Sequence, residues 1–301
     1  MKAADDRCFF CQASNLRLAY RNGYHKRKPD YGPFDLYQCE ACGSAVTLPP
    51  PAADMLSDFY RTTTEFGMSK STRKILAKNP EAAWHDMSAR RIVALSGKKR
   101  EDAFTWIDIG AGAGEMALML ANQFPVATGI ALDIHERPPT LEGTAIQWHR
   151  VDLSDLEWPA RLGVHGDIVY ATGVWEHVER ADLFARAALS LMAPHGLLYM
   201  TTPNYSSLAR RVFGSRWPYY APGEHIAMPT PKGARLCLAN ELRNMHGTQA
   251  KARISAKPIL VQYSAGFVLT KLGIPWIAKR MPNRPRVYLP SGAMEAVVRL
   301  I

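Results

Sequence analysis

The sequence predicts an α/β protein with a doubly wound, mostly parallel sheet and a small N-terminal zinc ribbon. Three observations support this fold class. Short apolar runs alternate with helix-length stretches between residues 104 and 203. The glycine-rich stretch DIGAGAG at 108–114 lies between the first of these runs and a helix-length stretch, and two C-x-x-C pairs precede both. Such an alternation is typical of parallel sheets, which bind ligands at the carboxyl ends of their strands.

Residues 1–48 are expected to form a zinc-ribbon-like module. Two cysteine pairs lie in this segment, Cys8 with Cys11 and Cys39 with Cys42. The first residues do not have the pattern of an export signal, so we expect four thiolates around one structural Zn²⁺ rather than disulfides. The segment has little apolar periodicity, and metal binding would replace the missing core. Four cysteines complete the coordination shell, so His25 is interpreted as a residue of a long basic loop.

Residues 49–100 are predicted to form a helical linker or lid. The prolines of LPPPAADM at 48–55 interrupt regular structure and mark a boundary. The stretches at 55–69 and 81–97 then have the composition of helices. Their aromatic residues are expected to pack against the core, namely Tyr60, Phe66 and Trp84.

Residues 101–301 are predicted to form the main domain. Strands are expected at 104–109, 126–133, 145–152, 166–173 and 196–203, and helices at 115–124 and 180–193. The runs DIVYAT and LLYMTT are apolar on both faces, as buried parallel strands tend to be. Beyond residue 204 the pattern weakens. A helix is clear only at 233–245, and a strand and helix are expected within 264–280.

The formal charge of +10 is concentrated in the last third of the chain. Residues 1–203 contain 22 Lys and Arg against 24 Asp and Glu, whereas residues 204–301 contain 15 against 3. We therefore interpret 204–301 as a basic, substrate-side region that meets phosphate, an acidic membrane surface or nucleic acid. A solvated basic face is the alternative. No apolar run is long enough for a membrane span, so a cytoplasmic protein is expected, with contact at the inner face of the membrane left open.

The glycine turn favours a ligand other than a nicotinamide dinucleotide. A glycine turn between a strand and a helix lets the backbone approach a ligand closely. The dinucleotide pattern G-x-G-x-x-G would require a third glycine at 115, where this chain has Glu115. A carboxylate there would repel a pyrophosphate, so a ligand end that is uncharged or cationic is expected.

With these features, WIDIGAGAG resembles motif I of the class I S-adenosylmethionine-dependent methyltransferases, which have a Rossmann-like fold. The similarity continues in order through GIALD, HRVDL, GDIVYATGVWEHVER and LMAPHGLLYMTTPN, over about residues 88–205. It implies that Asp108 and the turn hold the methionine end of the cofactor, Asp133 the ribose hydroxyls, and Asp152 with Leu153 the adenine. The glycines of the turn are Gly110, Gly112 and Gly114.

The cysteine pairs extend this resemblance to bacterial methyltransferases of sugar, polysaccharide and antibiotic biosynthesis, which carry a comparable four-cysteine module. GEHIAMPTP at 223–231 is similar to a segment that completes their substrate pocket. On that basis Glu224 and His225 are candidate pocket residues.

Methyl transfer to a hydroxyl requires alignment of the acceptor and removal of its proton. His177, in GVWEHV, is the first candidate for the base and His225 the second. The alternative is that Glu176 and His177 cap a helix or form a structural pair. The quinone O-methyltransferases that this stretch resembles have E-x-x-E-H here, and Gly173 replaces the first glutamate. A catalytic metal is therefore not expected.

We interpret the protein as a methyltransferase for a hydroxyl of a small-molecule or glycan acceptor, with a phosphate-bearing or lipid-linked sugar preferred. Charge reversal at Arg210, Arg211 and Lys232 is then expected to weaken acceptor binding. An RNA methyltransferase is one alternative, although YATGV lacks the N-P-P-Y type of sequence found in enzymes that methylate base amines. A non-catalytic scaffold that only binds the cofactor is another, and C-methylation of a sugar stays open.

Overall fold

A computed structural model describes residues 7–24, 32–52, 54–56, 84–155, 157–247, 251–266, 277 and 286–301. Its central sheet has seven strands in the order β10-β11-β8-β7-β4-β5-β6. The strands are β4 (Thr105–Ile109), β5 (Thr128–Asp133), β6 (Gln147–Arg150), β7 (Gly166–Thr172), β8 (Met192–Pro203), β10 (Ala252–Ser264) and β11 (Arg286–Leu300). Neighbours from β8 to β6 run parallel, and β11 is antiparallel to both β8 and β10. The predicted doubly wound, mostly parallel sheet is confirmed.

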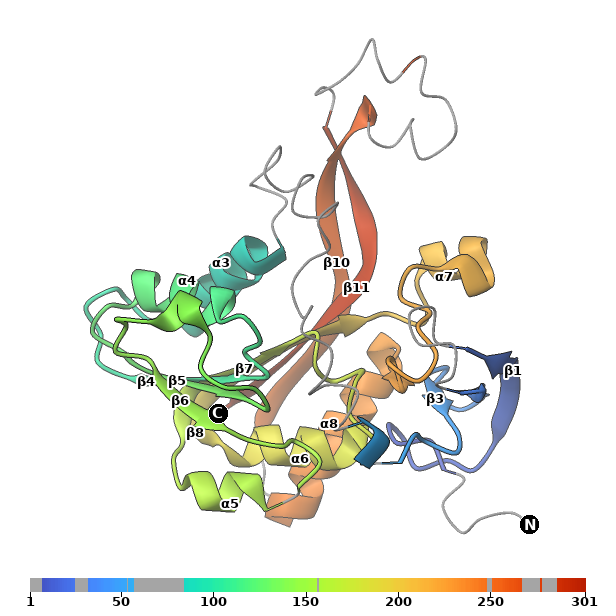
Figure 1. The fold of residues 1–301 in the computed structure, drawn as a ribbon, viewed down its shortest axis with the longest axis horizontal. Coiled ribbons are helices and arrows are strands. Elements are labelled where there is room, and N and C mark those ends of the chain that lie inside the picture. The colour runs from blue at the N-terminus through green and yellow to red at the C-terminus, as the bar shows by residue number, and fades with distance from the viewer. Residues whose placement is uncertain are drawn as a thin grey trace.

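Helices cover both faces of this sheet (Figure 1). One face carries α3 (Trp84–Ser96) and α4 (Glu115–Gln123), and the other carries α5 (Trp158–Leu162), α6 (Ala181–Ser190) and α8 (Pro231–His246). Along β4, Trp106 packs with α3 and α4, whereas Ile107 packs toward α6 and α8. Successive side chains of a strand point to opposite faces, so these continuous apolar runs form two cores.

The N-terminal cysteines belong to a second sheet that is joined to the main domain. Its order is β1 (Leu16–Gly23), β2 (Phe34–Cys39), β3 (Ala45–Thr47) and β9 (Ala227–Met228). We call the described residues from 7 to 48 the cysteine module. β9 pairs with β3 although 180 residues separate Ala227 from Thr47 in the chain. Phe10 also packs edge-to-face on Trp175, with ring centroids 5.6 Å apart, so the module shares the core of the α6 and α8 face.

The long hairpin β10–β11 was not predicted. It projects from the body in Figure 1 and adds two strands at the edge of the sheet beside β8. Pro258 and Pro290 break the sequence pattern of a strand, and both tolerate their positions for physical reasons. Pro258 lies on the edge strand next to a register shift, and Pro290 lies beyond the stretch of β11 that pairs with β8.

Several predicted segments lie outside the described residues. These are the loop around His25, the whole stretch at 57–83 with Tyr60 and Phe66, and most of 264–280. The remaining short elements are the 3₁₀ turns η2 (Pro139–Leu141) and η3 (Gly214–Arg216) and the helix α7 (Leu208–Phe213). Among the helices that the structure describes, none combines the length and the apolar character needed to cross a bilayer.

Candidate active site

A cavity of about 400 Å³ opens at the carboxyl ends of β4, β5 and β7. The turn after β4 and the end of β5 form one side, and the segment after β7 forms another. Six residues predicted from the sequence line it, namely Gly110, Gly112, Asp133, Asp152, Leu153 and His177. Asp108 and Gly114 lie next to this wall rather than among the lining residues. The sheet therefore brings the spaced motifs into one pocket, as its topology requires.

The glycines of the turn are needed for packing as well as for conformation. Gly110 has φ +73°, and an added Cβ would lie 2.5 Å from Val174 Cγ2. Gly114 has φ +74°, and an added Cβ would lie 2.6 Å from Leu141 Cγ. Both backbones are in the left-handed region that favours glycine. Glu115, the first residue of α4, forms a hydrogen bond with His85 Nδ1 at 3.0 Å.

Asp133 ties the turn to the end of β5. Its Oδ2 accepts a hydrogen bond from the Gly112 amide at 2.8 Å. Its Oδ1 accepts one from the His135 amide at 3.0 Å and contacts His135 Nδ1 at 2.7 Å. His135 was not predicted, since no sequence pattern distinguishes it from a surface histidine. A carboxylate offers about four acceptor positions, so Asp133 keeps capacity for a hydroxyl on the pocket side.

Asp108 is a buried carboxyl group behind the glycine turn. Its Oδ2 has no hydrogen-bond partner. Its pKa is raised to about 8, with burial as the main cause and the charge of Asp133 acting in the same direction, while the nearby Tyr170 hydroxyl opposes the shift. A buried carboxyl group with an unsatisfied oxygen is stabilised in its charged form by a nearby cation. The residues at this end of the pocket therefore fit a ligand that carries an ammonium group.

His177, on the pocket wall formed by the segment after β7, contacts His225, which is not among the lining residues, and no sequence pattern predicted this contact. The rings of His177 and His225 have centroids 4.8 Å apart. His177 Nδ1 lies 3.0 Å from the carbonyl oxygen of Glu224, and His225 Nδ1 lies 2.6 Å from that of Tyr219. A carbonyl oxygen only accepts, so the Nδ1 of each ring carries a proton. Burial lowers the pKa of His177 to about 3, with the charge of His225 as the second cause.

Glu176 lies beside this pair. It is buried, its Oε2 has no hydrogen-bond partner, and burial raises its pKa to about 7. Ligand atoms of Glu176, His177 and His225 lie within 4.8 Å of one another, a spacing that could hold a metal ion. Gly173 offers no ligand atom, but His225 brings a third candidate ligand to Glu176 and His177 from a distant segment.

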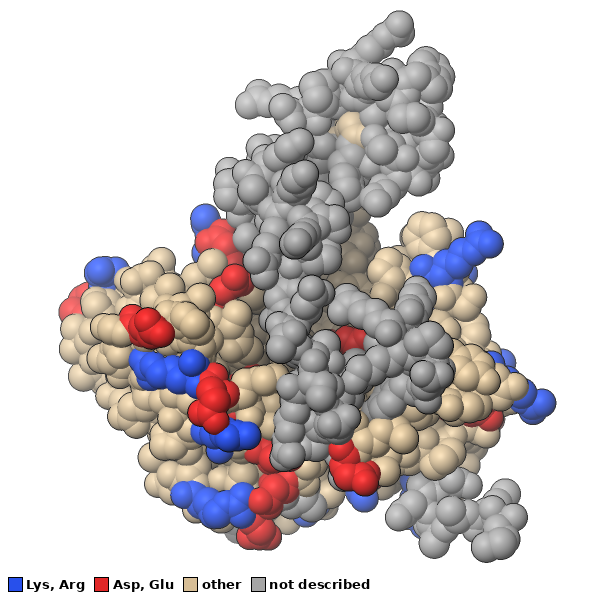
Figure 2. Space-filling view, viewed as in Figure 1, with Lys and Arg blue, Asp and Glu red and all other residues tan. Residues whose placement is uncertain are grey.

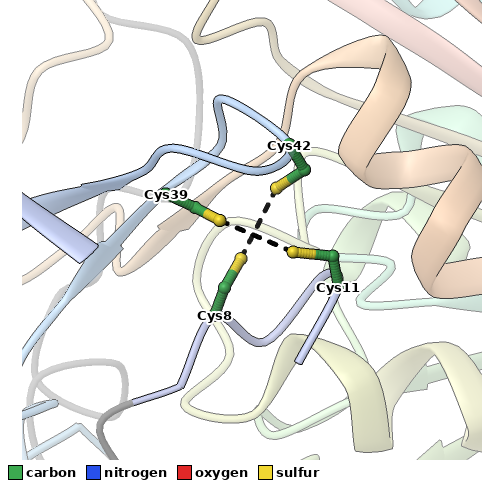
Figure 3. Close-up of side chains that lie close together, drawn as sticks. All are labelled: Cys8, Cys11, Cys39 and Cys42. Atoms are coloured by element: carbon green, nitrogen blue, oxygen red, sulfur yellow. Dashed lines mark hydrogen bonds between the residues drawn. The ribbon is translucent and has the colours of Figure 1, made fainter. Parts of the chain in front are cut away.

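The four cysteines of the two pairs point toward a common centre in Figure 3. The sulfur atoms of Cys8 and Cys42 are 3.6 Å apart, and those of Cys11 and Cys39 are 3.5 Å apart. All four sulfurs lie within 4.8 Å of one another. Cys237 is buried below them, with its sulfur 3.9 Å from the carbonyl oxygen of Phe9. The cysteines of the two pairs could thus hold a metal ion, and Cys237 packs against the cysteine module.

The three cations expected to meet an anionic acceptor have different surroundings. Lys232 Nζ donates to the carbonyl oxygen of Ala41 at 2.7 Å, which places it against the cysteine module. The Arg210 guanidinium lies 4.4 Å from the centroid of the Tyr205 ring. Arg211 is exposed on α7. Charge reversal at Lys232 would therefore disturb the module as well as any acceptor.

Comparison with known proteins gives one family and several similar structures. The profile of a family described as a methyltransferase domain matches residues 80–241. The plantazolicin methyltransferase BpumL, in complex with S-adenosylhomocysteine (SAH), has a TM-score of 0.52 and 14% identity, covering 82% of this chain and 95% of that chain. The plantazolicin methyltransferase BamL, with a triazolic desmethylPZN analog and SAH, has a TM-score of 0.50 and 13% identity, covering 81% and 96%. No curated protein matches the sequence. These structures share the fold.

Proposed function

This chain belongs to the methyltransferase domain family and is an S-adenosylmethionine-dependent methyltransferase, and on that premise we propose that its acceptor is a hydroxyl of a small molecule or glycan. The preferred acceptor is a sugar that carries a phosphate or a lipid carrier. One observation supports this proposal above the others. Five of the seven residues expected to hold the cofactor line the same cavity as His177, so donor and acceptor would meet in it.

The cofactor residues keep the roles that the resemblance implies. Asp133 would accept the ribose hydroxyls, and Asp152 with the Leu153 amide would hold the adenine. The buried Asp108 would stabilise the ammonium group of the methionine end, because its unsatisfied oxygen favours a cation. S-adenosylmethionine supplies a methyl group that is already activated by the sulfonium, so the chain itself must align the acceptor.

His177 is proposed to receive the acceptor proton on Nε2. As the new carbon–oxygen bond forms and the carbon–sulfur bond breaks, the acceptor oxygen becomes strongly acidic, and SAH leaves. The low pKa of His177 keeps its ring neutral at physiological pH, so Nε2 carries a lone pair that can take up the proton. His225 stays the second candidate, since its ring contacts that of His177.

We also propose that Cys8, Cys11, Cys39 and Cys42 bind one structural Zn²⁺. A tetrahedral site with Zn–S bonds of about 2.3 Å has sulfur–sulfur edges of about 3.8 Å. The two measured separations of 3.6 and 3.5 Å are close to that value. Four sulfur ligands leave no open position, which favours a structural role for the module at residues 1–48.

The charge distribution supports an anionic acceptor. Two of the three acidic residues in 204–301 are buried and neutralised by arginines, Glu241 by Arg186 and Glu295 by Arg91. The exposed surface of this region is therefore more basic than its count of charged residues alone indicates. Long-range attraction of a phosphate to such a surface raises its local concentration.

Incubation with labelled S-adenosylmethionine and a panel of phosphosugars, free sugars and phenols tests the proposal, with SAH and labelled product measured together. We expect SAH only with a hydroxyl acceptor, and faster turnover when the acceptor carries phosphate. The His177→Ala variant should lose about 10²- to 10⁴-fold in rate and keep its affinity for SAH. Turnover only with RNA, or label on carbon, would reject the O-methylation proposal. SAH affinity without turnover on any acceptor would favour the scaffold reading.

A further inference from the structure

The helix α7 exposes an apolar surface that the site described above does not use. Leu208, Val212 and Phe213 are 67%, 68% and 53% exposed. Leu208 and Val212 are four residues apart and therefore lie on the same side of this short helix, and Phe213, its last residue, extends the exposed apolar surface beside Val212. Single exposed apolar residues are common on proteins, but three within six residues form a patch.

This patch rests on a firmly packed base. Ser207 caps the helix, its Oγ accepting a hydrogen bond from the Arg210 amide. Tyr205 and Trp217, on either side of the helix in sequence, are each only 1% exposed and their rings lie 6.4 Å apart. The exposed side chains therefore belong to a defined protrusion rather than to a loosely packed loop end.

Two exposed arginines lie next to the patch in the sequence. Arg211 lies on α7 between Leu208 and Val212, and Arg216 follows in η3, and both are exposed. Residues 205–220 contain three arginines and no Asp or Glu. Figure 2 shows the blue side chains of this region at the upper right, standing out from the body. Apolar side chains with flanking cations and no acid are complementary to an anionic bilayer.

The patch lies on an excursion of the chain that ends beside the pocket residue His177. The chain leaves the carboxyl end of β8 at Pro203, forms α7 and η3, and returns to place His225 against His177. The same excursion thus carries both the exposed surface and His225, whose ring contacts that of the pocket residue His177. A bilayer held by α7 would supply its headgroups to this side of the molecule.

From these observations we infer that Leu208, Val212 and Phe213 insert into the interface of an anionic membrane while Arg211 and Arg216 contact its headgroups. This inference rests on the proposed function, because it specifies a membrane-borne acceptor. A second copy of the chain fits less well, since a twofold contact through α7 would bring Arg211 and Arg216 near their own copies. A stable protein interface needs about 800 Å² per partner, more than three side chains supply.

Co-sedimentation of the full-length, zinc-loaded protein with vesicles tests the inference. Phosphatidylcholine vesicles with about 30% phosphatidylglycerol should bind at least tenfold more protein than pure phosphatidylcholine vesicles. The triple variant Leu208→Ser, Val212→Ser, Phe213→Ser should lose at least tenfold in binding to the anionic vesicles. Val126→Ser is the matched control, because Val126 is 57% exposed but isolated, and it should bind like the wild type.

A second pair of variants tests the charges. Arg211→Glu with Arg216→Glu should lose at least tenfold in vesicle binding, whereas Lys99→Glu with Arg243→Glu makes the same charge change at exposed sites on other elements and should lose less than threefold. SAH affinity should be unchanged in every variant, which separates this inference from the proposed function. Equal binding by the triple variant and the wild type, or no preference for anionic vesicles, overturns the inference. Self-association that the triple variant abolishes overturns it in favour of a contact between copies.

Discussion

The Asp133→Asn variant should bind SAH about 12- to 140-fold more weakly than the wild type. The carboxylate of Asp133 already accepts hydrogen bonds from the backbone amides of Gly112 and His135, and it contacts His135 Nδ1. An asparagine keeps one oxygen for the Gly112 amide, so that contact of the turn should persist, whereas its NH2 group cannot accept from the His135 amide. It loses one charged acceptor for the ribose diol, which costs about 1.5 to 3 kcal/mol. Each 1.4 kcal/mol is about tenfold in affinity, which gives the stated range.

Isothermal titration calorimetry with SAH is the appropriate assay. Asp155→Asn serves as the control, since Asp155 pairs with Arg161 on the surface and should leave SAH affinity unchanged. Asp133→Ala should lose more than Asp133→Asn, because it also releases the Gly112 amide. An Asp133→Asn affinity within twofold of the wild type would refute the ribose role and the reasoning from the turn.

Three further changes have defined outcomes. Cys39→Ser should reduce zinc from about one ion per chain to well below half by elemental analysis, and unchanged zinc content would remove Cys39 from the ligand set. Burial raises the pKa of Asp108 to about 8, so the folded protein keeps a proton that the unfolded chain loses near its ordinary pKa of 3.8. Stability due to Asp108 should therefore fall as pH rises from 5 to 8, and urea unfolding should show a smaller fall for Asp108→Asn; parallel curves would contradict this. Thr230 caps α8 and donates to the carbonyl oxygen of Cys42, so Thr230→Ala should lose about 2 kcal/mol of unfolding free energy, more than Ser207→Ala on the exposed α7. Equal losses in the two variants would show that the contact with the cysteine module contributes little.

The centre of the sheet was predictable because local pattern and topology agree there. From β4 to β8 each predicted strand overlaps the observed one, and β4, β5, β7 and β8 contain buried apolar runs, whereas β6 is polar and largely exposed. Gly110, Asp133 and Asp152 each lie at or just after the end of a predicted strand. Parallel strands end on the same side of a sheet, so these residues are expected at one edge of it. Local signals were sufficient for this half of the site.

The remaining features depend on contacts between distant segments. β10 and β11 contain prolines that are tolerated because Pro258 lies on the edge strand and Pro290 lies beyond the pairing with β8, and the sequence pattern shows neither. The contact between His177 and His225 arises because the chain returns after α7, and β9 pairs with β3 across most of the sequence. His135 and Asp133 are close in sequence, but only the fold decides that the ring turns toward the carboxylate. The hydrophobic periodicity of the sequence does not predict such contacts.

A crystal structure of the protein with SAH measures the central claim most directly. We expect SAH to lie in the cavity at the ends of β4 and β5, with its ribose hydroxyls hydrogen-bonded to Asp133 and its amino acid end along the turn at 110–114. SAH bound elsewhere, or a cavity that stays closed to it at saturating concentration, would contradict the account.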